Sequence, residues 1–167
     1  MRAPPLTPLA TALLHVPAPE RALVIGSGDG EPALLLAREF PAARVRGVDP
    51  SPERVRAASA RVGLDPEGRV AFKAGRPRAL PYPAGFFDLV VQLDREPATG
   101  EIARVLRPGG NLIVARLRVP RLAAARRALL RWRLARRGIA IAREEDAGEG
   151  NFLVARLQAG RRASRPD

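Results

Sequence analysis

The stretch "RALVIGSGDGEPALLLARE", residues 21–39, decides the fold. A run of apolar residues leads into three glycines at alternate positions, and a helical pattern follows them. The glycines are Gly26, Gly28 and Gly30. Glycine adopts positive φ and lets a ligand lie against bare backbone. Glu31 and Pro32 come next, and an acid and a proline both suit the first turn of a helix. The stretch therefore predicts a strand, a ligand-binding turn and a helix.

An acid further along the chain supports this interpretation of the turn. The glycine spacing is G-x-G-x-G, one residue shorter than the dinucleotide-binding fingerprint G-x-G-x-x-G. Asp49 ends the next predicted strand, 23 residues after Gly26. If the two strands are neighbours in a sheet, its carboxylate lies beside the turn and can accept hydrogen bonds from both hydroxyls of a ribose. The alternative is an ordinary glycine-rich loop and an unrelated surface aspartate, which the strand–turn–helix context disfavours.

Short β-type runs alternate with helical runs along the chain, as in parallel α/β sheets. The turn-rich "EDAGEG" near the end predicts an antiparallel hairpin, and "RPGG" at 107–110 predicts a turn. We expect strands at 22–25, 44–48, 70–73, 87–91, 111–116, 139–144 and 151–157, and helices at 32–40, 52–62, 99–106 and 121–137. The predicted fold class is α/β: a Rossmann-like three-layer sandwich with a seven-stranded, mostly parallel sheet and an antiparallel terminal strand.

Length and composition limit the remaining possibilities. The 167 residues suit one domain, which we place at 1–159, followed by a basic tail, "GRRASRPD", that we expect to be disordered. The chain has no cysteine and one histidine, so we expect no disulfide framework and no metal site. No run approaches the roughly 18 apolar residues of a membrane span. Prolines interrupt the first 22 residues, which argues against a signal peptide, and we expect a cytoplasmic protein.

Four motifs in register resemble those of the class I S-adenosylmethionine-dependent methyltransferases. They are most similar to the type 11 domain, whose members include quinone-biosynthesis C-methyltransferases. The motifs are "LVIGSGDGEPALLLA", "VRGVDPSPERVRAA", "LPYPAGFFDLVV" and "EIARVLRPGGNLIVA", which together span about residues 21–116. The resemblance implies the cofactor S-adenosylmethionine and transfer of its methyl group to an acceptor that these motifs do not identify.

The resemblance also implies which residues contact the cofactor. The glycine turn would bind the methionine end, Asp49 the ribose, and Gln92 would lie near the sulfonium. The segment after the third strand would line the adenine pocket. The implied contacts are Gly26, Ser27, Gly28, Gly30, Asp49, Pro50, Gly75, Arg76, Pro77 and Gln92.

Three features depart from the family pattern. Val24 stands where the family usually has an acid that helps to bind the ammonium group of the cofactor. Arg76 stands where an aspartate would accept a hydrogen bond from the adenine amine, and a guanidinium has no acceptor. It could instead stack on adenine or recruit a phosphate. The segment between Val91 and the helix at 99–106 is short, and the chain lacks a substantial N-terminal helical cap. These departures favour an alternative function, a non-catalytic binding or regulatory module with an altered cofactor site.

No catalytic residue is predicted, because methyl transfer from a sulfonium needs alignment more than a fixed triad. Asp94 and Glu96 are the nearest candidate bases after the fourth strand, but a solvated loop explains them better. His15 is better explained as a packing residue ahead of the first strand.

Positive charge is concentrated in the second part of the chain. Residues 116–167 hold 14 basic and 5 acidic residues, a net of +9 out of a total of +12. For the arginine-rich helix at 121–137 we expect one side, with Leu122, Ala125, Leu129 and Trp132, to pack on the sheet while the arginines remain solvated. A nucleic-acid-binding module is a second alternative function, and anionic lipid or an acidic partner remains open. Nucleic acid is not favoured, because Trp132 has no aromatic neighbour with which to form a stacking platform.

Overall fold

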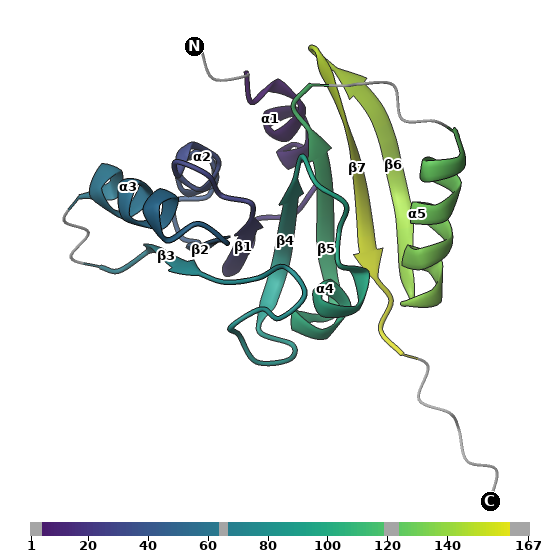
Figure 1. Ribbon diagram of the computed structural model, residues 1–167. Helices are drawn as coiled ribbons and strands as arrows, with labels where there is room; N and C mark the ends of the chain where they lie inside the picture. Colours follow the sequence, from purple (N-terminus) through teal and green to yellow (C-terminus); the bar gives the residue numbers. More distant parts are fainter. Residues whose placement is uncertain (1–4, 64–66, 119–123, 161–167) are drawn as a thin grey trace, which may run out of the picture.

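A computed structural model of the chain describes residues 5–63, 67–118 and 124–160. It contains one seven-stranded sheet flanked by helices on both faces (Figure 1). The strands are β1 (Arg21–Ile25), β2 (Arg44–Asp49), β3 (Val70–Ala74), β4 (Phe87–Leu93), β5 (Leu106–Arg116), β6 (Ile139–Ala147) and β7 (Gly150–Leu157). The helices are α1 (Thr7–Leu13), α2 (Glu31–Glu39), α3 (Pro52–Val62), α4 (Thr99–Val105) and α5 (Ala124–Arg136).

The strand order is β3-β2-β1-β4-β5-β7-β6, and only the pairings of β7 are antiparallel. The predicted fold class is therefore confirmed. The antiparallel strand is the last along the chain, but it lies inside the sheet between β5 and β6, and β6 forms the edge. The order reverses at β1, because the chain moves from β1 to β2 and β3 on one side and returns to β4 on the other. A reversal of this kind leaves a crevice at the carboxyl ends of the central strands, where open α/β sheets bind ligands.

Two apolar clusters fill the spaces between the sheet and the helices. Leu9 of α1 and Leu36 of α2 pack against one face of the sheet, where both side chains are fully buried. On the other face, Ile102 of α4 and Leu134 of α5 are equally buried. These clusters hold β1 and β4 in the centre of a three-layer structure.

The first 20 residues contain a helix that the sequence interpretation missed. Pro8 occupies an early position in α1, where proline is compatible with a helix. Leu9, Ala12 and Leu13 are buried against the sheet, so this short helix covers a part of the core for which the sequence analysis expected no helix. His15 follows the helix, and its ring stacks on Phe152 with 5.9 Å between the centroids.

Two other expectations were wrong. Strand β5 begins at Leu106 and not at residue 111, because "RPGG" lies within an irregular part of the strand, where its register with β4 shifts between Phe87 and Leu89. Helix α5 packs on the sheet through Leu130 and Leu134, whereas Leu129 and Trp132 are 45% and 55% exposed. The predicted start of this helix, with Leu122, lies outside the described residues, and so does all of the predicted tail except Gly160.

The turn between β6 and β7 gives a stability prediction. A Cβ on Gly150 would lie 1.9 Å from the carbonyl oxygen of Arg116 and 2.9 Å from that of Leu117. Because both atoms are backbone, Gly150→Ala should displace the hairpin from β5 and lower the free energy of unfolding by about 1–3 kcal/mol or more. Urea denaturation measures the change. Gly160→Ala is the control, since no atom lies within 4 Å of its added Cβ. Equal midpoints for the two variants would contradict this packing.

Candidate functional site

The glycine turn after β1 is bonded to the end of β2. Gly26, Gly28 and Gly30 have φ of 77°, 55° and 92°, which non-glycine residues rarely adopt. The backbone N–H groups of Gly26 and Ser27 both donate to the carbonyl oxygen of Val48, at 2.9 and 3.2 Å. The N–H of Gly30 donates to the carbonyl oxygen of Ser27 at 2.9 Å. The turn is thus closed by hydrogen bonds within the protein, and it is fixed in place above the carboxyl end of β1.

The three glycines have different surroundings. A Cβ on Gly30 would lie 3.1 Å from Ala58 of α3 and from the ring of Phe72, so this glycine allows α2, α3 and β3 to approach one another. A Cβ on Gly26 would be 3.4 Å from the carbonyl oxygen of Leu93. A Cβ on Gly28 would have no atom within 4 Å. Gly28 therefore borders open space, which is what a ligand lying against the backbone requires.

Asp49 connects this turn to the strand beside it. Its side chain is 2% exposed, and each carboxylate oxygen accepts a backbone hydrogen bond, one from Gly28 at 3.1 Å and one from Ser51 at 2.9 Å. Ser51 also caps α3, because its Oγ accepts a hydrogen bond from the N–H of Arg54. The Arg54 guanidinium lies 3.8 Å from Asp49 Oδ2. Since a carboxylate oxygen can accept more than one hydrogen bond, Asp49 keeps acceptor capacity for hydroxyls of a ligand.

The predicted adenine-pocket residues lie next to Asp49. The N–H of Gly75 donates to the backbone carbonyl of Asp49 at 3.1 Å, which places the segment Gly75–Pro77 at the end of β2. Pro50 is exposed beside it, and so is Arg76. Among the described residues, the Arg76 guanidinium has no hydrogen bond or ion-pair partner. The structure thus brings together the turn, Asp49, Pro50 and residues 75–77.

Two buried side chains near the turn have polar atoms without a partner in the described part of the chain. They are the Oγ of Ser27 and the Oε1 of Gln92. Gln92 is 1% exposed, pairs with Ile25 in the sheet, and donates from Nε2 to the carbonyl oxygen of Leu93 at 3.2 Å. Unpartnered buried polar atoms are rare in native proteins and commonly mark a place for water or a ligand group. Val24, by contrast, is fully buried among apolar side chains and offers nothing polar.

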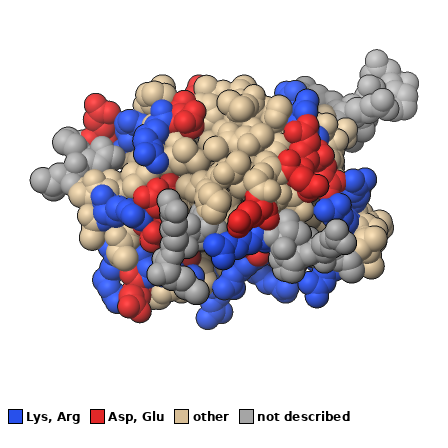
Figure 2. Space-filling model, turned by 90° about the horizontal axis from the view of Figure 1, so that it is seen from above, with Lys and Arg blue, Asp and Glu red and all other residues tan. Residues whose placement is uncertain are grey.

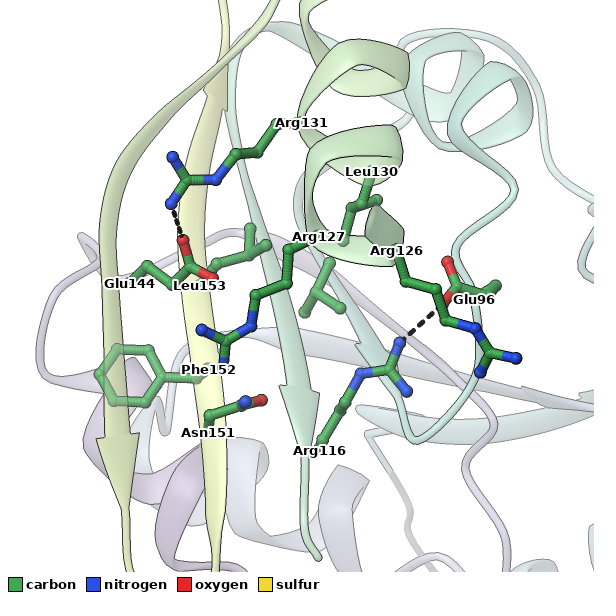
Figure 3. A pocket seen from close by; sticks show the side chains of 11 residues that line it. Glu96, Arg116, Arg126, Arg127, Leu130, Arg131, Glu144, Asn151, Phe152 and Leu153 are labelled. Carbon is green, nitrogen blue, oxygen red and sulfur yellow. Dashed lines mark hydrogen bonds and ion pairs between the residues drawn. The ribbon is translucent and has the colours of Figure 1, made fainter. Parts of the chain in front are cut away.

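The candidate bases after β4 are engaged in the structure. Asp94, with a φ of 54°, accepts a hydrogen bond from the N–H of Leu117 at 2.8 Å. Glu96 pairs with Arg116 at 2.8 Å. Figure 3 shows this pair beside a cavity beneath α5, with the pair of Arg131 and Glu144 on its other side. The cavity has a free volume of about 30 Å³, which is room for a water molecule but not for a methyl acceptor.

The sequence analysis did not predict that Glu101 and Arg104 bind the proline-rich loop "LPYPAG" at residues 80–85. We call this pair of side chains the clamp. Glu101 Oε2 accepts a hydrogen bond from the N–H of Leu80 at 2.8 Å, and Arg104 donates to the carbonyl oxygens of Tyr82 and Leu80 at 2.8 and 3.1 Å. The two side chains form an ion pair at 2.7 Å. A Cβ on Gly75 would lie 3.1 Å from Pro81 of this loop, so the clamp also supports the wall beside Asp49. The i, i+3 spacing of an acid and an arginine was the available sign.

Comparison with known proteins identifies the family. A family model for a methyltransferase domain matches residues 23–114, more than half of the chain.

The chain belongs to this methyltransferase domain family.

The chain is 40% identical over 105 residues to a demethylmenaquinone methyltransferase of Thermus thermophilus, covering 58% of this chain and 47% of that protein. It is 37% identical over 115 residues to a 27-O-demethylrifamycin SV methyltransferase of Amycolatopsis mediterranei, covering 64% and 42%. The chain thus spans less than half of the length of these relatives. A SAM-dependent methyltransferase structure from Aquifex aeolicus superposes with a TM-score of 0.74 at 17% identity, over 91% of this chain and 90% of that one.

S-adenosylmethionine is the cofactor that accompanies this family, and the residues present fit it. The ligand is rich in hydrogen-bond donors, with two ribose hydroxyls, an ammonium group and an adenine amine. The site offers acceptors in return: the Asp49 carboxylate and the unpartnered oxygens of Ser27 and Gln92. Gly28 borders the open space such a ligand would occupy. Within the described ranges no group of metal-ligating side chains occurs, and no helix is long and apolar enough to cross a membrane.

The clamp gives a pH-dependent prediction. The hydrogen bond from Arg104 is the main cause that lowers the pKa of Glu101 below its ordinary value of 4.5. A carboxyl group with a depressed folded-state pKa stabilises the protein above its unfolded pKa, and this contribution disappears as pH falls through the folded pKa. Glu101→Gln should therefore be less stable than the parent at neutral pH, and the difference should shrink below pH 4.5. Urea denaturation across pH measures it.

Glu149→Gln is the matched control, because Glu149 is an exposed acid whose arginine partner lies 3.7 Å away. It should differ little from the parent at any pH. A pH-independent effect of Glu101→Gln would show that the clamp works by packing rather than by charge.

Proposed function

We propose that this chain binds S-adenosylmethionine at the glycine turn and acts as a methyltransferase on a small organic acceptor. The observation that carries the proposal is the hydrogen bond between the Asp49 carboxylate and the N–H of Gly28. It joins the only acid at the carboxyl end of β2 to the one turn glycine that borders open space. The same carboxylate is available to ribose hydroxyls on its free lone pairs.

Each part of the site has a role in this proposal. When bound, the cofactor supplies an electrophilic methyl group on its sulfonium. Ser27 and Gln92 offer acceptors to the methionine end, and Gly75–Pro77 form the wall beside the adenine. Because the transfer is a direct displacement, the protein contributes alignment and exclusion of water rather than a covalent intermediate. The clamped loop at 80–83 and the tied segment after β4 keep these walls in place.

Two features support a small acceptor over a nucleic acid. The relatives are named for demethylmenaquinone and a demethylrifamycin, which are both small organic molecules. Figure 2 looks down on the side toward which the β4 and β5 arrows of Figure 1 point, and it shows acidic and basic groups interspersed around a broad uncharged area. A nucleic-acid groove would instead present a continuous basic surface.

A non-catalytic binding module remains the second candidate, and the structure contains a specific reason for it. Val24 is buried in the apolar core, so the ammonium end of the cofactor loses one charged partner at this position. Such a loss weakens binding without abolishing it. Cofactor binding with no methyl transfer to any of a panel of small phenols, quinols and amines would favour this candidate.

The first binding prediction concerns Asp49 and Gly28. Asp49→Ala removes the proposed ribose acceptor, and Gly28→Val fills the open space beside the turn. Each should weaken the binding of S-adenosylhomocysteine by at least about tenfold, measured by calorimetric titration. Asp49→Asn keeps one acceptor oxygen and should fall between the parent and Asp49→Ala. Asp146→Ala, at an exposed acid on β6, is the control and should bind like the parent. Folded variants with unchanged affinity would refute this site.

The second binding prediction concerns Arg76. Because its guanidinium is exposed and unpaired among the described residues, Arg76→Asp should leave the fold intact. The new carboxylate can accept a hydrogen bond from the adenine amine, so S-adenosylhomocysteine should bind up to about tenfold more tightly. Weaker binding of adenosine monophosphate by the variant, with no gain for S-adenosylhomocysteine, would instead show that Arg76 serves a phosphate. Calorimetric titration of both ligands distinguishes the two results.

A further inference from the structure

The outward face of α5 is apolar at its centre. Ala125, Ala128, Leu129 and Trp132 recur at helical spacing, so they share one side of the helix. All four are exposed, and Leu129 and Trp132 are two of the three large hydrophobic side chains that the described residues expose. The side of the helix that faces the sheet is occupied by Leu130 and Leu134. The core therefore does not use the apolar stripe, which we call the α5 stripe.

Arginines surround the α5 stripe: at helical spacing Arg126 and Arg133 lie along one side and Arg131 along the other, and Arg136 ends the stripe one turn after Trp132. Residues 124–137 contain six arginines and no acid: Arg126, Arg127, Arg131, Arg133, Arg136 and Arg137. The Arg136 guanidinium lies 4.9 Å from the centroid of the Trp132 ring, and Arg131 pairs with Glu144 of β6. This combination of a tryptophan and a leucine between long basic side chains is typical of helices that lie in the interface of an anionic membrane.

A hollow beside the α5 stripe is suited to an anionic headgroup. Thr99 at the start of α4 and Trp132, Arg133, Arg136 and Arg137 line a space of about 430 Å³. Arg137 lies against Gly100 of α4, where a Cβ would come within 3.3 Å of its Nη2. Three guanidinium groups around one opening favour a phosphate, and a hydroxyl from Thr99 can donate to it.

The position of α5 suits a flat partner. The helix lies beside the edge strand β6, at the end of the sheet away from α3 (Figure 1). Because Leu130 and Leu134 are the buried residues of α5 and the stripe residues are exposed, the α5 stripe faces away from the sheet. A second copy of the chain is a poor partner, because two such helices would bring their arginines together. A nucleic acid would use the arginines but leave Leu129 and the alanines in contact with a polar backbone. An anionic bilayer surface satisfies both the apolar stripe and the charge around it.

We propose that α5 docks this chain on anionic membrane surfaces, with Leu129 and Trp132 inserted at headgroup level and a lipid phosphate in the hollow lined by Arg133, Arg136 and Arg137. The docking surface is separate from the glycine turn and does not depend on the proposed enzymatic function. It can therefore be tested without cofactor or acceptor.

The test is sedimentation with lipid vesicles, together with the fluorescence of Trp132, which is the only tryptophan of the chain. Vesicles of phosphatidylcholine with about 30% phosphatidylglycerol should bind the protein at least about tenfold more tightly than pure phosphatidylcholine. The Trp132 emission should shift to shorter wavelength on binding, because the indole leaves water. Salt at about 0.5 M should weaken the binding, since the electrostatic part is screened.

Matched variants separate the contributions. Leu129→Ala with Trp132→Ala should reduce vesicle binding about tenfold, whereas Leu14→Ala, at a leucine that is 77% exposed elsewhere, should not. Arg133→Ala with Arg136→Ala should lower binding, and Arg38→Ala with Arg56→Ala, which removes equal charge from α2 and α3, should have a smaller effect. Circular dichroism checks that each variant is folded.

Several outcomes would overturn the proposal. The first is equal affinity for the two vesicle types, or no shift of the Trp132 emission. The second is a loss of binding with the arginine variants but none with Leu129→Ala and Trp132→Ala, which would indicate non-specific charge. The third is tighter binding to single-stranded polyuridylate than to vesicles, with the same dependence on Trp132, which would assign the face to nucleic acid. A concentration-dependent dimer abolished by Trp132→Ala would assign it to a second copy.

Discussion

The carboxylate of Asp49 connects the parts on which the proposed site depends. It accepts one hydrogen bond from the glycine turn after β1 and one from Ser51, which caps α3. The backbone of the same residue accepts a hydrogen bond from Gly75 after β3. Three separate loops thus meet at one nearly buried acid. A buried carboxylate is costly unless its oxygens are occupied by donors, so these contacts stabilise one another. The geometry of any ligand pocket here follows from this residue.

Strand order explains why these loops can meet at all. Because β2 and β4 both neighbour β1 and run parallel to it, the carboxyl ends of all three strands lie at the same edge of the sheet. The apolar clusters beneath fix the strands. Two of the four buried side-chain atoms that lack a partner among the described residues, on Ser27 and Gln92, are at or near the carboxyl ends of β1 and β4. The Asp94 contact with Leu117 and the Glu101–Arg104 clamp tie down the segments on either side. Contacts within the protein therefore hold the site mainly where the cofactor would lie, which is consistent with a family whose members share a cofactor and differ in acceptor.

The sequence was sufficient to predict the fold class, because the glycine turn and the helix signals at Glu31 and Pro32 act locally and strand-like runs alternate with helical runs along the chain. The contacts of Gly28 and Gly75 with Asp49 show that the glycine turn, Asp49 and the segment after β3 lie close together. The contacts of these residues with a cofactor stay predictions. The secondary-structure and packing predictions that were wrong depended on tertiary contacts. "RPGG" is a turn by composition, yet pairing with β4 draws it into β5. On α5 the pattern contained two apolar sides, and only packing against the sheet selects Leu130 and Leu134 over Leu129 and Trp132. The sequence analysis did not predict α1, because prolines disfavour a helix everywhere except in its first turn, which is where Pro8 lies.

The interior position of β7 has a consequence for how the protein is made. As the chain leaves the ribosome, β1 to β5 emerge before the strand that will cover β5, and for that time β5 is an open edge with unpaired backbone groups. The gap closes when β7 aligns with β5 through pairs such as Val114 with Leu153, and β7 pairs on its other side with β6. These contacts join residues far apart in sequence, which slows folding. Completion of the sheet thus coincides with the arrival of α5 and the hairpin, so the face that we assign to the membrane forms in the same late step as the closed core.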